Sequence, residues 1–360
     1  DHIWRIAGVT KASLDSAGLT VVDDLTISDK IIHAGDTNTA IRFPAADTVA
    51  VETAGSERIR VDSSGKLLVG TTTARTNFGP LDISAALQIE GTDYATSSLS
   101  LTSNGTSNTV SVLRLARSKG TAVGSNTIVA DNDLLGVIDF EGSDGTRFPI
   151  GARIEGSVDG TPGVGDMPGR LLFKTTADGN AITTEAMRIN SAQELLIGYT
   201  ADNGAYKLQV NSQIFATSAT VATSDGRYKE NVATLNGCID LVNALRPVSF
   251  DWKPQQDITR IDEDGNSVLV REGHNFPDGK QVGFIAQEVQ EVLADKPWLG
   301  SVIKQNVRPA IEDADGNELA PEEEFFGIAE GNLTAVLTAA LQEAIAMIGA
   351  LEARIAALEA

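Results

Sequence analysis

One stretch constrains the fold more than any other, Glu57-Arg58-Ile59-Arg60-Val61-Asp62-Ser63-Ser64-Gly65-Lys66-Leu67-Leu68-Val69-Gly70, because the chain repeats it. The second copy aligns without a gap and reads Glu185-Ala186-Met187-Arg188-Ile189-Asn190-Ser191-Ala192-Gln193-Glu194-Leu195-Leu196-Ile197-Gly198. In each copy two short alternating runs flank a polar turn, which predicts a β-hairpin. A single hairpin cannot bury its apolar side, so each copy needs further strands or a second chain.

Composition and charge exclude several classes of protein. Asp and Glu number 49 against 28 Lys and Arg, and the formal net charge of −21 argues against nucleic acid and anionic membrane surfaces as partners. The single Cys238 cannot form an intrachain disulfide, and the scattered His2, His33 and His274 show no ligand spacing, so we expect no metal and no cofactor. No run of 18 apolar residues occurs, so we expect no membrane insertion.

The pattern of apolar and polar residues changes near residue 224. Before it, short alternating runs separated by Gly, Asn, Asp and Ser predict mainly β structure. The thin apolar content of the first 50 residues argues against an independent core, a deficit that an intertwined trimeric fibre would resolve because its chains supply one another's missing neighbours. After residue 224 the patterns predict an α/β domain. The predicted parts are an extended β shaft at 1–75, a sandwich-like or barrel-like fibre domain at 76–182, a second hairpin repeat and linker at 183–223, and the α/β domain at 224–360.

The last segment, from about 333 to 360, predicts a helix with a heptad seam. Apolar residues recur at alternating steps of four and three, which is typical of a coiled coil. Ile at the a position and Leu at the d position lean toward two strands, although three heptads do not settle the number. The seam residues are Leu337, Leu341, Ala344, Ile348, Leu351, Ile355 and Leu358.

A polar stretch lies at the boundary between the two textures, Ser224-Asp225-Gly226-Arg227-Tyr228-Lys229-Glu230-Asn231-Val232. A serine nucleophile with a lysine base is one interpretation, because a desolvated lysine can take the proton of a serine hydroxyl. Five residues correspond to about 140° on a regular helix, so the pair requires Ser224 in a turn or an extended segment, or a lysine from another chain. Alternatively, Ser224 and Asp225 cap a helix and Lys229 is a solvated charge.

The boundary stretch resembles the signature S-D-x-R-x-K-x-N-V/I, which opens the intramolecular chaperone of the S74 peptidase type. Three further segments resemble motifs of the same family in the same order, so the resemblance spans 224–360. Tyr228 departs from the Leu that many relatives carry. The chain thus resembles bacteriophage fibre and spike proteins that end in this domain. The further segments are Leu245-Arg246-Pro247-Val248-Ser249-Phe250-Asp251-Trp252, Gly283-Phe284-Ile285-Ala286-Gln287-Glu288-Val289, and Asn332-Leu333-Thr334-Ala335-Val336-Leu337 through Gln342-Glu343.

The resemblance implies a homotrimer whose C-terminal domain holds three fibre chains in register and then cuts itself off once. The cleaved bond would lie between Thr223 and Ser224, with Ser224 as the nucleophile and Lys229 as the general base. The terminal helices would form a three-stranded bundle. Supporting residues would be Asp225, Arg227, Asn231, Gln287 and Glu288.

The resemblance also implies a place for the protein. It would be a virion fibre assembled in the cytoplasm of the host bacterium, with other virion proteins bound upstream of Asp1 and a host surface glycan or protein as its receptor. Two alternatives stay open, namely an uncleaved trimerisation module and a glycan depolymerase. No acid pair of the glycosidase kind stands out among so many solvated carboxylates.

Overall fold

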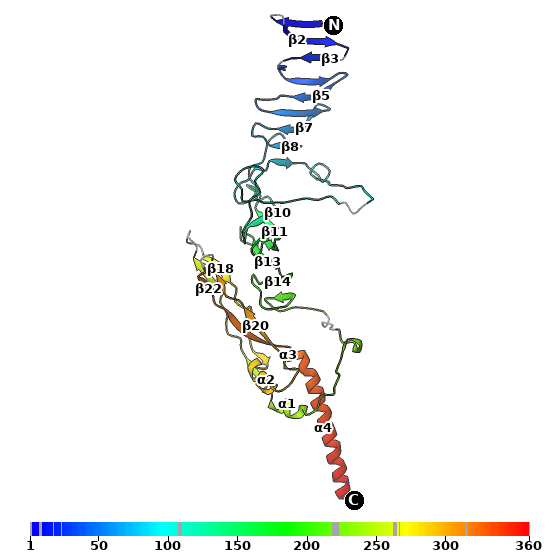
Figure 1. The fold of residues 1–360 in the computed structure, drawn as a ribbon, viewed down its shortest axis with the longest axis vertical. Coiled ribbons are helices and arrows are strands. Elements are labelled where there is room, and N and C mark those ends of the chain that lie inside the picture. Colours follow the sequence, from blue (N-terminus) through cyan, green and yellow to red (C-terminus); the bar gives the residue numbers. More distant parts are fainter. Residues whose placement is uncertain are drawn as a thin grey trace. The chain divides into compact units, whose positions relative to one another are not determined.

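The structure is a computed structural model that describes residues 2–6, 9–16, 18–22, 24–106, 110–217, 223–261, 265, 267–313 and 316–359. Contacts divide the chain into two compact units, residues 1–114 with 140–151, and residues 115–139 with 152–360. Before residue 224 the described residues contain strands and turns and no helix, which confirms the predicted β-rich character (Figure 1). A long helix ends the chain, as predicted.

Two sheets occupy the first unit (Figure 1). The first is a three-stranded antiparallel meander, β1-β2-β3. The second has six strands in sequence order, antiparallel from β4 to β8, and β9 then joins β8 in parallel. The strands are β1 (His2–Ile6), β2 (Val9–Asp15), β3 (Gly18–Val21), β4 (Lys30–His33), β5 (Asp36–Arg42), β6 (Val49–Thr53), β7 (Ser56–Val61), β8 (Leu67–Val69) and β9 (Leu87–Ile89).

Another six-stranded sheet follows, with its strands again in sequence order. Its last part repeats the arrangement of β7, β8 and β9, because β13 and β14 form the second hairpin and β15 joins β14 in parallel. Both predicted hairpins are therefore present. The strands are β10 (Leu134–Glu141), β11 (Ile150–Val158), β12 (Gly169–Thr175), β13 (Thr184–Ile189), β14 (Leu195–Ile197) and β15 (Leu208–Val210).

Two buried glutamines explain why the parallel strands β9 and β15 belong to the repeat. The amide oxygen of Gln88 accepts a hydrogen bond from Arg75 N at 2.8 Å, and that of Gln209 accepts one from Asn203 N at 2.8 Å. In each case the side-chain amide nitrogen, Nε2, donates to loop carbonyls, such as Arg75 O and Gly204 O. Each glutamine thus ties its strand to the loop that leads into it.

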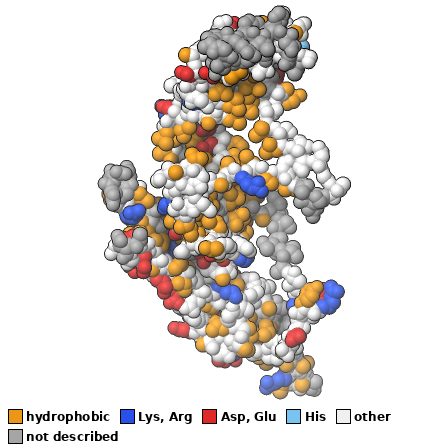
Figure 2. All heavy atoms as spheres, turned by 45° about the horizontal axis from the view of Figure 1, so that its top comes forward, with side chains coloured by type: hydrophobic (Ala, Val, Ile, Leu, Met, Phe, Trp, Pro, Cys, Tyr) orange, Lys and Arg blue, Asp and Glu red, His pale blue; other side chains and the backbone are white. Residues whose placement is uncertain are grey.

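Both six-stranded sheets leave one face open and apolar. In the first, the partnered residues of β4 to β9 form one apolar row across six strands, and a second row crosses β6 to β9. In the other, two such rows cross β12 to β15. We call these four the open rows. Figure 2 shows that many hydrophobic side chains lie on the surface in view. They are Ile31-Ile41-Val51-Ile59-Val69-Ile89, Val49-Val61-Leu67-Leu87, Leu171-Ile189-Leu195-Leu208 and Phe173-Met187-Ile197-Val210.

Most side chains of the open rows are exposed in the single chain and the others are half-buried, whereas several side chains on the opposite faces are fully buried. Ile31 is 50% exposed and Leu208 is 53% exposed, but Leu68 and Leu196, which lie on the opposite faces, are completely buried. A row of aliphatic side chains exposes a large apolar surface to water, and burying that surface would be favourable. These faces are therefore suited to contact with other chains.

The residues after 224 form a mixed α/β domain with a small helical core. Val289, Leu293, Val302 and Leu333 make one cluster, and Cys238 packs in a second with the last helix. The elements are η1 (Gly226–Tyr228), α1 (Cys238–Ala244), β16 (Val248–Phe250), β17 (Ile258–Ile261), β18 (Ser267–Arg271), β19 (Gln281–Gly283), α2 (Ala286–Val292), α3 (Leu299–Val302), β20 (Ile303–Arg308), β21 (Ile311–Glu312), β22 (Glu318–Ala320), β23 (Glu323–Ile328) and α4 (Glu330–Glu359).

Helix α4 has two different apolar faces. Its first turns bury Leu333, Val336 and Ala340 against the domain, while the seam residues stay open, with Leu341 62% and Ile355 54% exposed. By length and composition alone α4 is also apolar enough to cross a membrane, a test that helices buried in soluble proteins pass as well. The heptad spacing of the exposed residues favours packing against other helices.

Candidate functional site

A short turn fixes the residues around the predicted cleavage point. Ser224 lies just before η1, and Asp225 caps this turn by accepting a hydrogen bond from Arg227 N at 2.9 Å. The Arg227 guanidinium also pairs with the Asp225 carboxylate at 2.6 Å, and this hydrogen bond lowers the pKa of Asp225. Asn231 follows with φ of 54°, a left-handed conformation that Asn tolerates well. These three residues shape the backbone of the turn.

The turn brings Lys229 back onto Ser224. Lys229 Nζ donates a hydrogen bond to Ser224 Oγ at 2.7 Å. The two side chains can meet because η1 covers only Gly226–Tyr228, while Lys229 itself has extended backbone angles. The divergence expected on a regular helix does not apply here.

Solvent exposure limits what this pair can do in a single chain. Ser224 and Lys229 are both exposed, and the lysine acts as the hydrogen-bond donor. A lysine can accept a proton only as the neutral amine, and removal from water favours the neutral form. The two side chains are therefore in contact, whereas the removal from water that would make a lysine act as a base requires additional cover.

Gln287 and Glu288 lie on α2, and among the described residues neither makes a hydrogen bond or ion pair with Ser224 or Lys229. Glu288 forms a two-pronged ion pair with Arg246, in which Arg246 Nε lies 3.0 Å from the carboxylate. The hydrogen bonds from Arg246 lower the pKa of Glu288. This pair joins α2 to the segment after α1, so Glu288 supports the domain and is not part of the serine–lysine pair.

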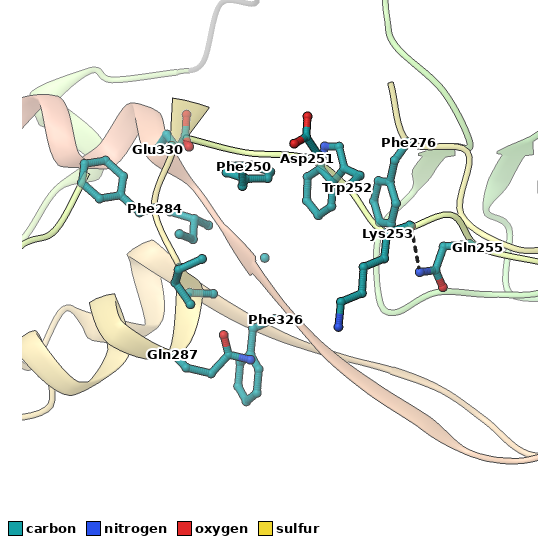
Figure 3. Close-up of a pocket in the computed structure, with 15 residues that line it drawn as sticks. Phe250, Asp251, Trp252, Lys253, Gln255, Phe276, Phe284, Gln287, Phe326 and Glu330 are labelled. Atoms are coloured by element: carbon teal, nitrogen blue, oxygen red, sulfur yellow. Dashed lines mark hydrogen bonds between the residues drawn. The ribbon is translucent and has the colours of Figure 1, made fainter. Parts of the chain in front are cut away.

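Gln287 borders an aromatic hollow of about 580 Å³ (Figure 3). Phe250, Phe284 and Phe326 line the hollow, and the Trp252 ring stacks on Phe276 with centroids 4.0 Å apart. Most of these residues come from the second and third motifs. These motifs therefore build the aromatic packing of the domain.

Glu343 has a structural role that the sequence did not reveal. Helix α1 begins after Gly237, which has φ of 70° and offers no capping side chain. Glu343 of α4 supplies the cap, because its carboxylate accepts from Cys238 N at 3.2 Å and from Ile239 N at 3.1 Å. The sequence placed Gln342-Glu343 in the last motif but did not indicate that Glu343 caps a helix. The cap fastens α1 to the long helix.

We expect Glu343→Ala to lower the melting temperature of the domain, because two N–H groups at the start of α1 would lose their acceptor. The backbone N–H groups of Ile239 and Cys238 lower the pKa of Glu343, so its contribution should be present above pH 4.5 and be lost as pH falls through the lowered pKa. Thermal melts at pH 7 and pH 3.5 measure both effects. Gln342→Ala, at an exposed neighbour, is the control, and equal melting temperatures for the two variants would contradict the capping role.

A polar contact joins the second hairpin repeat to the C-terminal domain within the second unit. A hydrogen bond of 2.8 Å links Tyr199 Oη and His274 Nδ1, and Glu272 accepts hydrogen bonds from Thr200 N and Thr200 Oγ1. Burial, followed by the charge of Arg308, lowers the pKa of His274, although Glu323 and Glu272 oppose this shift. The contact thus prefers a neutral histidine.

Acidification should loosen this contact. Because the pKa of His274 in the folded chain is lower than its usual 6.5, stability is present above pH 6.5 and decreases as pH falls toward the lowered value. Hydrogen exchange of residues 199–211 is expected to quicken between pH 7.5 and pH 5.5, after correction for intrinsic rates. In His274→Gln, which cannot titrate, this acceleration should be absent. An equal acceleration in the variant would contradict a role for His274.

Comparison with known proteins finds a family that resembles the first part of the C-terminal domain. Residues 224–296 match the model of the Peptidase_S74 family, described as chaperone of endosialidase. This match confirms the resemblance over the first three of the four motifs. A search of curated proteins found no match.

Two solved structures from bacteriophage T5 are similar to the chain. One is the carboxy-terminal domain of the L-shaped tail fibre with its intramolecular chaperone domain, at 13% identity and a TM-score of 0.39, covering 99% of both chains. The other is the carboxy-terminal domain of the same tail fibre, at 13% identity and a TM-score of 0.36, covering 55% of this chain and 87% of that one.

Proposed function

We propose that this chain is part of a bacteriophage fibre whose C-terminal domain assembles three copies and then cleaves the bond between Thr223 and Ser224. The 2.7 Å hydrogen bond between Lys229 Nζ and Ser224 Oγ carries the proposal of cleavage. The match of residues 224–296 to a family of chaperones supports the proposal of assembly. Such a fibre would attach to a host surface glycan or protein and join other virion proteins upstream of Asp1.

The chemistry of cleavage needs only these two side chains and water. Neutral Lys229 takes the proton of Ser224 Oγ, and the oxygen attacks the carbonyl carbon of Thr223. The C–N bond breaks, the proton passes to the nitrogen of Ser224, and an ester joins the two residues. Water then hydrolyses the ester, which releases the Thr223 carboxylate and restores the Ser224 hydroxyl, so that Ser224 with its free amine begins the second fragment.

Assembly would provide the cover that the exposed pair lacks. A neighbouring chain packed over Lys229 would remove water from the amine and favour its neutral form. Cleavage would then follow assembly, so that a chain which has not found its partners stays joined to its chaperone. This order suits a β fibre, in which alignment of several chains is slow.

The open rows and the seam of α4 support an oligomer. Each aliphatic side chain that moves from water into a core contributes about 1.5–3 kcal/mol, and these rows together hold many such side chains. Three equivalent sheets could cover one another's open faces, while three copies of α4 pack along their seams.

Two measurements on the freshly expressed chain test the proposal. Denaturing electrophoresis should give two bands, near two-thirds and one-third of the chain, for fragments of 223 and 137 residues. Sedimentation under native conditions should give the mass of three copies. A trimer that keeps one full-length band would contradict cleavage and favour an uncleaved trimerisation module, and a monomer would contradict assembly.

A further inference from the structure

Two copies of the same local structure allow an internal comparison. Residues 57–90 form the first repeat and residues 185–211 form the second, each a hairpin followed by a loop and a strand that joins it in parallel. The two repeats end alike, because the N–H groups of Glu90 and Asn211 each donate to the neighbouring strand at 2.9 Å. Glu90 and Asn211 are therefore equivalent. The second repeat belongs to the same compact unit as the C-terminal domain, and the first does not.

Asn211 binds the backbone of the C-terminal domain. Its amide oxygen accepts a hydrogen bond from Asn275 N at 2.7 Å, and its amide nitrogen donates one to Gly273 O at 3.2 Å. The pair of bonds requires an acceptor and a donor on one short side chain, which asparagine has. The equivalent Glu90 is a carboxylate with two acceptors and no donor, so it cannot bind Gly273 O in this way. In the first repeat Glu90 pairs with Arg75 of its own loop.

Two tyrosines of the second repeat also contact the C-terminal domain. Tyr199 Oη lies 2.8 Å from His274 Nδ1, and the Tyr199 ring centroid lies 5.9 Å from the guanidinium carbon of Arg308. Tyr206 Oη donates to Asn306 Oδ1 at 2.8 Å. Each tyrosine thus supplies a hydroxyl at the end of a long, rigid side chain.

The first repeat has short side chains at both of these positions. Counting from the glycine that ends each hairpin, Thr71 takes the place of Tyr199. Counting back from the parallel strand, Ala85 takes the place of Tyr206. Threonine lacks the ring and alanine lacks the hydroxyl, so neither can make the contact that its equivalent makes.

The groups that the second repeat meets are buried. Glu272 and Asn306 are 7% and 8% exposed, and Arg308, whose guanidinium donates to Glu272 O at 2.7 Å, is 2% exposed. The Glu272 carboxylate accepts hydrogen bonds from Thr200 N and Thr200 Oγ1, and the first repeat has a threonine at this position as well, Thr72. A repeat without matching partners would leave buried polar groups unsatisfied, which makes such a surface selective.

We propose that the C-terminal domain recognises the second repeat through Tyr199, Tyr206 and Asn211 and discriminates against the first. The inference rests on the proposed chaperone function and names the segment of the fibre that the chaperone holds. Residues that build the repeat itself are the same in both copies, as Gln88 and Gln209 show. The recognising side chains differ, and each difference removes a contact with the C-terminal domain.

Exchanging residues between the repeats tests the inference without foreign side chains. The triple variant Tyr199→Thr, Tyr206→Ala and Asn211→Glu gives the second repeat the residues of the first. It is made in the full chain with Ser224→Ala, so that the proposed cleavage cannot separate the two sides. The repeat should still fold, because the first repeat forms the same strand pairings with these residues.

Hydrogen exchange of single amides separates recognition from folding. The amides of Thr200 and Asn275 donate across the contact, so in the triple variant they should exchange at least about tenfold faster than in the parent Ser224→Ala chain. The amide of Leu195, which donates to Lys207 O inside the repeat at 2.9 Å, should keep its protection.

A matched double variant serves as the control. Ile197→Val and Val210→Ile also introduce residues of the first repeat, at aliphatic positions of the open rows, and should leave the amides of Thr200 and Asn275 protected. Equal exchange of these amides in the triple variant and the control would overturn the inference. If the Leu195 amide loses protection in the triple variant, Asn211→Glu alone decides by the same criterion.

The same measurement distinguishes this inference from the proposed function. A parent chain that protects both contact amides and sediments as a monomer would contradict the proposed assembly and leave the recognition standing. A trimer whose contact amides exchange at the rates of an unstructured chain would overturn the recognition alone.

Discussion

Ser224→Ala and Lys229→Ala are each expected to leave one full-length band where the unaltered chain gives two, and to sediment with the mass of three full-length copies. Each substitution removes one half of the hydrogen-bonded pair, so the rate of cleavage should fall by about 10³-fold or more. Glu230→Ala, at an exposed residue next to Lys229, is the control and should cleave normally. The measurement is a time course on a denaturing gel after assembly is complete.

Lys229→Arg distinguishes a base from a structural hydrogen bond. Arginine keeps the positive charge and can still donate to Ser224 Oγ, but it stays protonated and cannot take the proton. The variant should therefore be as inactive as Lys229→Ala. Cleavage at the normal rate in Lys229→Arg would show that the lysine only holds the turn in place.

Charges in the seam of α4 should abolish assembly. In the double variant Ile348→Asp and Leu351→Asp, two apolar side chains that are 55% and 54% exposed in the single chain become carboxylates. Three copies would bring six such groups together in one seam, at a cost that a short bundle cannot offset. We expect a monomer by sedimentation and no cleavage, because the pair at Ser224 would stay solvated.

A control on the opposite side of α4 makes this prediction specific. Ala353 is exposed and lies off the seam, so Ala353→Asp should assemble and cleave like the unaltered chain. Far-ultraviolet circular dichroism should show similar helix content in both proteins. If the seam variant still cleaved as a monomer, activation by assembly would be wrong, although the dyad itself would not be.

The sequence predicted the local elements whose pattern is strong. Both hairpins of the repeat are present, because Asp62 and Asn190 turn the chain by accepting hydrogen bonds from the backbone of Lys66 and Glu194. Apolar residues from Leu235 to Leu245 have a helical spacing, but helix α1 begins only at Cys238, since Gly237 adopts a left-handed conformation and the cap comes from Glu343. A cap that lies about a hundred residues away leaves no local signal.

Other features depended on contacts that spacing does not encode. Strands β9 and β15 were missed. Each pairs in parallel with a strand on the other side of a loop, and the short sequence around Gln88 or Gln209 gives no sign of that pairing. The approach of Lys229 to Ser224 depends on a three-residue turn. Residue types alone did not distinguish this turn from a helix cap. Their roles in cleavage stay predictions.

The two glutamines that hold their loops also suggest how such a chain could vary during evolution. One glutamine anchors a loop of residues 70–86 and the other a loop of residues 198–207, while the strand pairings around them are the same. The two loops thus differ in length outside the sheet, and the register of the strands does not depend on that length. A foreign peptide grafted between Gly198 and Leu208 should leave the pairing of β13, β14 and β15 intact if Gln209 keeps its acceptors.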